Sequence, residues 1–139
     1  MNEKKLQEIK DYISQTSETS KIYLGCDSTA YLRNKQRMVD YYWVVVVHIN
    51  GRNGCRIFGD RMTEPDYSKD KKKPLYRLMT EVQKVAELYM HLEESIGDRE
   101  VEIHLDLNPS SKHASNLIVD QAIGYIKGTC NVVPLIKPD

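Results

Sequence analysis

The sequence predicts an α/β fold, in which helices flank a five-stranded mixed sheet and an extra helix precedes the first strand. Residues 41–49 (YYWVVVVHI) are β-branched and aromatic and contain no Gly or Pro, which is typical of a strand. Apolar residues between 75 and 92 recur at helical spacing, which indicates a long amphipathic helix. After the first helix, the predicted order is β-β-β-α-β-α-β, with helices as the later crossovers.

The N-terminal half is predicted to hold a helix and three strands. Leu6, Ile9 and Ile13 recur at helical spacing, so residues 1–18 should comprise a short helix and a loop. The last two strands should form a hairpin, because the segment between them is rich in Asn and Gly. The expected elements are a helix at 3–15, strands at 21–26, 41–49 and 55–59, a polar turn at 30–38, a hairpin turn at 50–54 and an irregular segment at 61–73.

The C-terminal half is predicted to alternate helices and strands. Pro74 suits the first turn of a helix, and Gly97 and Gly128 follow the two helical patterns. Pro134 interrupts the last strand, which should therefore lie at an edge of the sheet. The expected elements are a helix at 74–95, a strand at 101–107, a helix from about 114 to 128 and a strand at 132–136.

Length and composition exclude several classes of protein. The 139 residues suit a single domain spanning 1–139, and 20 Lys and Arg balance 20 Asp and Glu, so a dedicated basic nucleic-acid coat is not supported. No apolar run approaches the roughly 20 residues that span a bilayer, and the charged N-terminus lacks a secretory signal. Three cysteines without a CxxC pair indicate neither a disulfide framework nor a zinc ribbon. We therefore expect a cytoplasmic protein without membrane partners.

Three acidic residues fall at or near the ends of predicted strands, namely Asp27, Asp106 and Asp139. Ligands bind at strand ends in open α/β sheets, and clustered carboxylates repel each other unless a cation or a proton neutralises them. Mg²⁺ and Mn²⁺ prefer oxygen ligands, and two such ions can activate water against a phosphodiester. Taken singly, each Asp is more simply explained as a turn or capping residue, and it is their joint placement that favours a site.

Five motifs in order, GCDS, RLMTEV, HLDLN, SNLI and IKPD, together with the order of elements, resemble the ribonuclease H-like superfamily. More closely, they resemble the YkuK-type family of predicted ribonuclease H-like proteins over roughly residues 20–139. The resemblance implies hydrolysis of nucleic-acid phosphodiesters with two Mg²⁺ or Mn²⁺ ions, leaving a 3′-hydroxyl and a 5′-phosphate. The final helix that the superfamily usually carries has no counterpart before Asp139.

The resemblance also implies roles for four carboxylates. Asp27 would bridge both metal ions, Glu81 would bind one of them, and Asp106 would bind metal and position water. Asp139 would match the last acid of the superfamily. Helix geometry supports Glu81 independently, because it lies on the border of the predicted apolar stripe, although a solvated flanking residue would occupy the same position.

Other residues are candidates for substrate contact. Ser28 could bind a phosphate or a metal-bound water, or could cap a turn; His113 could move protons or contact substrate near Asn108. Lys137 could hold a phosphate. Lys71 and Lys72 belong to a lysine cluster that could contact a nucleic-acid backbone, although a solvated loop is the simpler interpretation.

The sequence therefore favours a metal-dependent nuclease and leaves its substrate open among RNA, DNA and hybrid, and its mode open among endonuclease, exonuclease and junction resolvase. The alternative is a catalytically inactive ribonuclease H-like binding module. A third hypothesis is that a second copy of the chain, as in a homo-oligomer, completes the site or the sheet edge.

Overall fold

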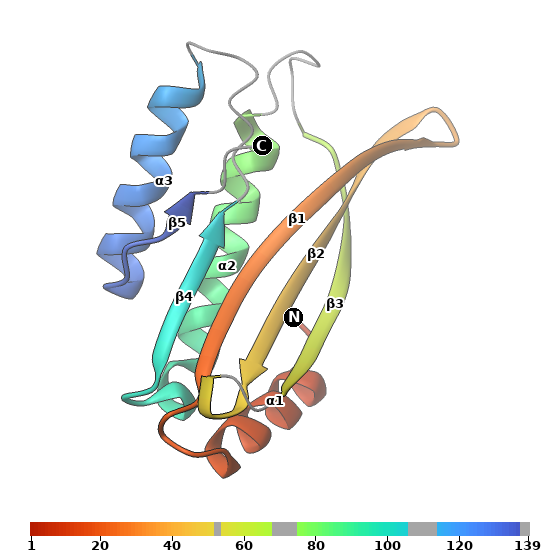
Figure 1. Cartoon of the computed structure of the whole chain (residues 1–139). Helices are drawn as coiled ribbons and strands as arrows, with labels where there is room; N and C mark the ends of the chain where they lie inside the picture. The colour runs from red at the N-terminus through yellow and green to blue at the C-terminus, as the bar shows by residue number, and fades with distance from the viewer. Residues whose placement is uncertain (52–53, 68–74, 106–113, 137–139) are drawn as a thin grey trace.

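The computed structural model describes residues 1–51, 54–67, 75–105 and 114–136 (Figure 1). The elements follow the predicted order and confirm the α/β class with its extra N-terminal helix. They are α1 (Glu3–Gln15), β1 (Lys21–Arg33), β2 (Gln36–His48), the short 3-10 helix η1 (Ile49–Gly51), β3 (Cys55–Pro65), α2 (Leu75–Ile96), β4 (Glu100–Leu105), α3 (Ala114–Cys130) and β5 (Leu135–Ile136).

The strands form one mixed sheet in the order β3-β2-β1-β4-β5. The pairs β1–β2 and β2–β3 are antiparallel, as the two hairpins require. The pairs β1–β4 and β4–β5 are parallel, which is the geometry that helical crossovers produce. β1 therefore lies at the centre of the sheet, where its side chains reach both faces.

The hydrophobic core lies between the sheet and α2, which runs behind β1 and β4 in Figure 1. Strand side chains alternate between faces, so every second residue of β1 points toward α2. Ile22, Leu24 and Cys26 are these residues, and all three are buried. The facing stripe of α2 supplies further core residues, namely Val82, Val85, Ala86, Leu88, Leu92 and Ile96.

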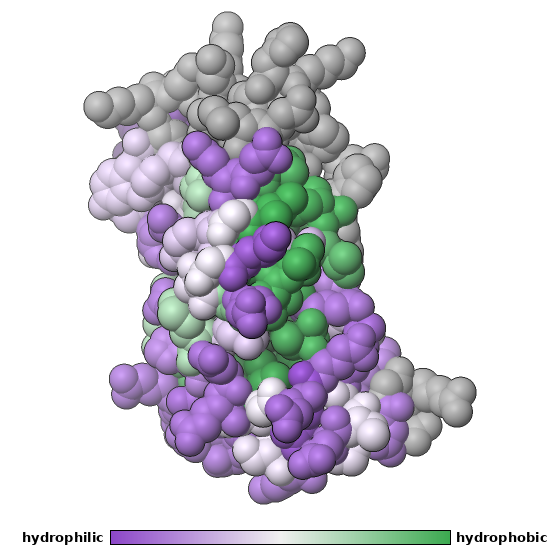
Figure 2. Space-filling model, turned by 90° about the vertical axis from the view of Figure 1, so that its left-hand side faces the viewer, coloured by the Kyte–Doolittle hydropathy of each residue, from purple (hydrophilic) through white to green (hydrophobic). Residues whose placement is uncertain are grey.

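The opposite face of the sheet has no helix over it in the part of the chain that the structure describes. Tyr42 and Val44 on β2 are 44% and 36% exposed, and Ile57 on β3 is 65% exposed. Hydrophobic surface also appears on the side view of Figure 2, and Val133 and Leu135 near the β5 edge are exposed. We call the uncovered side of the sheet the open face and the other side the helix face.

The first hairpin differs from its prediction. β1 continues through Asp27 to Arg33, and β2 begins at Gln36, so a two-residue turn replaces the predicted polar turn at 30–38. Asn34 and Lys35 have φ of 50° and 67°, which suits a tight hairpin turn. The prediction was wrong because the outward-facing residues of these strand ends are polar and resemble a loop in composition.

Other boundaries differ less. β3 continues to Pro65, beyond the strand predicted at 55–59, because it stays paired with β2 as far as Met38. β5 has only two residues, which agrees with an edge strand broken by Pro134. The helix predicted at 3–15 is confirmed as α1, and its first turn is capped by the side chain of Asn2, which accepts a hydrogen bond from the backbone N–H of Lys5.

The helices and the cysteines show two further features. None of the helices in the described ranges is long and apolar enough to cross a bilayer. All three cysteines carry free thiols; Cys26 and Cys130 are buried, and Cys55 is exposed.

Candidate active site

Ser28 joins two of the predicted site carboxylates. Its backbone N–H donates to Oδ1 of Asp27 at 2.8 Å, and its hydroxyl donates to Oε2 of Glu81 at 2.5 Å. The alternation of β1 explains this arrangement, because it directs Ser28 to the helix face and Asp27 to the open face. The two carboxylates therefore lie on either side of β1, each one hydrogen bond from Ser28.

Glu81 is a buried carboxylate on the central helix. It is 4% exposed and lies one turn before Val85 on the stripe of α2 that faces the sheet. The alternative of a solvated flanking residue is therefore wrong. A buried carboxylate requires hydrogen-bond donors or a cation, and the hydroxyl of Ser28 is one such donor.

Ser28 is also not a turn-capping residue, since it lies inside β1. Its hydroxyl is directed toward α2 rather than into a turn of its own strand. The structure thus assigns this side chain to the orientation of Glu81, while any contact of Ser28 with phosphate or water remains a prediction.

The charges around β1 act on the thiol of Cys26. Burial raises the pKa of Cys26 to about 12, and the negative charges of Glu81 and Asp27 act in the same direction. The ammonium of Lys84 opposes them. Lys84 is itself buried; it pairs with Oε2 of Glu64 at 2.5 Å and lies 4.9 Å from the ring centre of Tyr41. The helix-face side of the site is therefore a buried and charged environment.

On the open face, Asp27 begins a row of polar side chains that crosses three strands. Asp27 pairs in register with Tyr42 of β2, which pairs in register with Arg61 of β3. The next row contains Asp40, whose carboxylate accepts hydrogen bonds from the hydroxyls of Thr63 at 2.7 Å and Tyr42 at 3.3 Å. Asp27 is thus exposed beside Tyr42, and Arg61 lies one strand further along the same row.

Tyr31 completes the cluster around Asp40, to which its hydroxyl donates at 2.9 Å, and Nη1 of Arg61 lies 3.9 Å from Oδ2 of Asp40. The hydroxyl of Thr63, followed by that of Tyr31 and the charge of Arg61, holds the pKa of Asp40 below its usual value. Asp40 is therefore an ionised acceptor that orients two tyrosine side chains.

The remaining predicted site residues lie outside the described residues, namely Asp106, Asp139, Asn108, His113, Lys137, Lys71 and Lys72. Their position relative to Asp27 and Glu81 stays a prediction. Within the described ranges, no three His, Cys, Asp or Glu residues are grouped closely enough to hold a metal ion. The described part of the site thus supplies the carboxylates of Asp27 and Glu81, while Asp106 and Asp139 remain candidate ligands.

The two strand histidines lie on the open face. Nε2 of His104 lies 3.0 Å from Oε2 of Glu102, and the rings of His48 and His104 both contact Tyr23 edge-on. These contacts pack both histidine rings against Tyr23.

Sequence reasoning missed Asp40 and Lys84. Asp40 interrupts an apolar strand between Val39 and Tyr41, and this interruption was the available signal. Lys84 lies three residues after Glu81, on the same side of α2, but a lysine on the border of an apolar stripe usually extends to solvent. The pairing of Lys84 appears only in the tertiary structure, where Glu64 of β3 comes to lie next to it.

The fold and the site define an α/β protein with a buried helix carboxylate that faces the central strand of a 3-2-1-4-5 sheet. The chain belongs to the ribonuclease H-like family, whose model matches residues 4–139. No curated protein and no solved structure gives a significant match. The narrower resemblance to the YkuK type remains a prediction.

Proposed function

We propose that the protein is a metal-dependent nuclease that hydrolyses phosphodiester bonds of nucleic acid. The oxygen of a water molecule would form a new bond to phosphorus while the bond from phosphorus to the 3′ oxygen breaks. The products would be a 5′-phosphate and a 3′-hydroxyl. Membership of the ribonuclease H-like family supports this reaction class.

The observation that carries the proposal is the pairing of Glu81 with Ser28 beside Asp27. Burying a carboxylate in the apolar stripe of a helix is unfavourable unless its environment compensates. A functional role explains why an acid occupies a position where an aliphatic residue would pack. Ser28 holds Glu81 in one orientation, and its N–H holds Asp27, so two acids are preorganised across one strand.

The donor chemistry fits Mg²⁺ or Mn²⁺. Carboxylate oxygens are ligands that these ions prefer, and Mg²⁺ is commonly held by one or two protein carboxylates together with substrate phosphates. Asp27 and Glu81 would hold the ions, with Asp106 and Asp139 as the further proposed ligands. When bound, a pair of ions lowers the pKa of water and stabilises the leaving oxygen.

The test is calorimetric titration with Mn²⁺, paired with cleavage assays on single-stranded, duplex and hybrid substrates. We expect Asp27→Asn and Glu81→Gln to lose both metal binding and cleavage. The matched controls are Asp98→Asn and Glu94→Gln, which replace exposed acids and should behave as the wild type.

Absence of Mn²⁺ binding by the wild type at millimolar concentration would contradict the proposal for this chain. Binding of metal without cleavage of any substrate would instead support the inactive binding module. Light scattering on the same samples would show whether a second copy takes part.

A further inference from the structure

Two glycines in one cross-strand row form a groove across the open face. Gly25 of β1 and Gly59 of β3 both pair in register with Val44 of β2. Because neither glycine has a side chain, the surface is low on both sides of Val44. Two depressions of about 300 Å³ and about 550 Å³ lie here, and both are lined by Val44.

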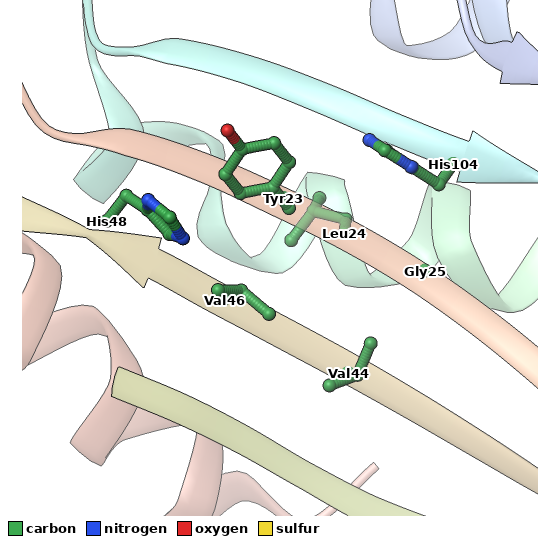
Figure 3. Close-up of a pocket in the computed structure, with 7 residues that line it drawn as sticks. All are labelled: Tyr23, Leu24, Gly25, Val44, Val46, His48 and His104. Carbon is green, nitrogen blue, oxygen red and sulfur yellow. The ribbon is translucent and has the colours of Figure 1, made fainter. Parts of the chain in front are cut away.

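Aromatic rings form the walls of this groove. Figure 3 shows the smaller depression, where Tyr23 stands between His48 and His104 and the backbone of Gly25 is bare. Tyr42 and Arg61 line the larger depression. Rings that stand on an open sheet can stack on unpaired bases, and such stacking tolerates any base sequence.

The larger depression continues into the candidate active site. Tyr42 is the register neighbour of Asp27, and Arg61 is the next residue in the same row. Neighbouring strands are about 4.8 Å apart, so the row from Asp27 to Arg61 extends for about 10 Å. A nucleic-acid strand bound along this row would pass from the carboxylate of Asp27 over the ring of Tyr42 to the guanidinium of Arg61.

The charge of the row suits a phosphate backbone at one end. The side chain of Arg61 is 62% exposed, and its nearest carboxylate is 3.9 Å away, so its planar donors can also reach a phosphate. Asp40 lies on the same face but is buried in its cluster, where its oxygens accept hydrogen bonds from Thr63, Tyr31 and Tyr42. These donors stabilise the negative charge of Asp40 within the cluster.

We propose that this groove binds single-stranded nucleic acid, with a base stacked on Tyr42 over Gly59 and an adjacent phosphate at Arg61, and that Asp40 positions Tyr42. This inference rests on the proposed function and adds a substrate class to it. A paired duplex keeps its bases stacked inside and cannot place one on a strand-face tyrosine, so the groove favours unpaired nucleotides.

The first test measures binding apart from cleavage. Fluorescence anisotropy with a labelled 12-nucleotide single strand is performed on the Asp27→Asn protein in EDTA, with the matching duplex as competitor. Tyr42→Ala should weaken binding by at least about fivefold, as expected from the loss of one stacked base. Arg61→Gln should weaken it and lower the salt slope by about 0.7.

Matched controls are available on the same elements. Arg56 lies in β3 on the other face, where it pairs with Glu8, so Arg56→Gln should leave binding unchanged. Tyr125 is an exposed tyrosine on α3 and gives the control Tyr125→Ala. Val44→Glu places a charge on an exposed groove position and should abolish binding without disturbing the core.

Asp40 is tested as a positioning residue. Asp40→Asn should weaken binding less than Tyr42→Ala, and Tyr42→Phe, which keeps the ring but loses the hydroxyl contact to Asp40, should reproduce the effect of Asp40→Asn. A purely structural role for Asp40 would change the unfolding temperature and leave the binding of the folded protein unaltered.

The outcomes separate this inference from the proposed function. The groove proposal would be wrong if the protein bound duplex as tightly as single strands, or if Tyr42→Ala bound as tightly as the wild type. Either result would count against it even if the enzyme cleaves nucleic acid. Single-strand binding that depends on Tyr42, in a protein that binds no metal, would support the groove while the nuclease proposal fails.

Discussion

Ser28 donates its hydroxyl to Oε2 of Glu81 at 2.5 Å, although the two residues are 53 positions apart in the chain. The contact joins the central strand to the central helix at the point where Asp27 emerges on the other face. It thereby ties a buried acid to the centre of the sheet.

Removing the hydroxyl should destabilise the protein. Ser28→Ala deprives the buried Glu81 carboxylate of a donor, and we expect a loss of about 1–3 kcal/mol in the free energy of unfolding. Ser28→Thr keeps the hydroxyl and serves as control. Urea unfolding at neutral pH measures both variants, and a loss below about 0.5 kcal/mol for Ser28→Ala would show that the bond contributes little.

Removing Glu64 should lower the free energy of unfolding more than removing its partner Lys84. The Lys84 side chain is 9% exposed and that of Glu64 is 33% exposed. Glu64→Gln leaves a buried ammonium uncompensated and should cost about 3 kcal/mol, whereas Lys84→Met leaves a carboxylate that can turn toward water and should cost about 1 kcal/mol. Denaturant unfolding of the two variants tests the order, which equal losses would contradict.

Asp40 should make the stability of the protein depend on pH, because it contributes at neutral pH and not in acid. Its pKa is lower in the folded state, so its contribution is present above the unfolded pKa of about 3.9 and is lost as the pH falls through the folded value. The unfolding temperatures of the wild type and Asp40→Asn should therefore differ at pH 7, and the difference should shrink as the pH falls below the unfolded pKa. A difference that is constant with pH would assign the effect to packing.

The three thiols should differ in reactivity. Burial raises the pKa of Cys26 to about 12 and that of Cys130 to about 11, so neither forms the reactive thiolate readily at pH 8. Cys55 is exposed. Ellman's reagent should label one thiol rapidly, and Cys55→Ser should remove that phase. Fast labelling of two thiols in the native protein would indicate that a buried site opens.

The order of the elements was predictable because it depends on local patterns. The run at residues 41–49 and the helical spacing of α1 are properties of neighbouring residues, and both elements were identified correctly in type. The hairpin extension over residues 27–40 was not predicted, because its outward residues are as polar as a loop. Pairing with the adjacent strand, rather than composition, stabilises that segment.

The sequence by itself determined the class of fold, since strand alternation and helical periodicity are patterns of neighbouring residues. Asp27 was a candidate because it follows a predicted strand, and Glu81 because the motifs resemble the ribonuclease H-like superfamily. Only the tertiary structure decided that Glu81 is buried against Ser28, that Lys84 pairs with Glu64, and that Tyr42 and Arg61 share a row with Asp27. These relationships depend on strand register and on where α2 crosses the sheet. Such long-range geometry joins residues that no local pattern connects.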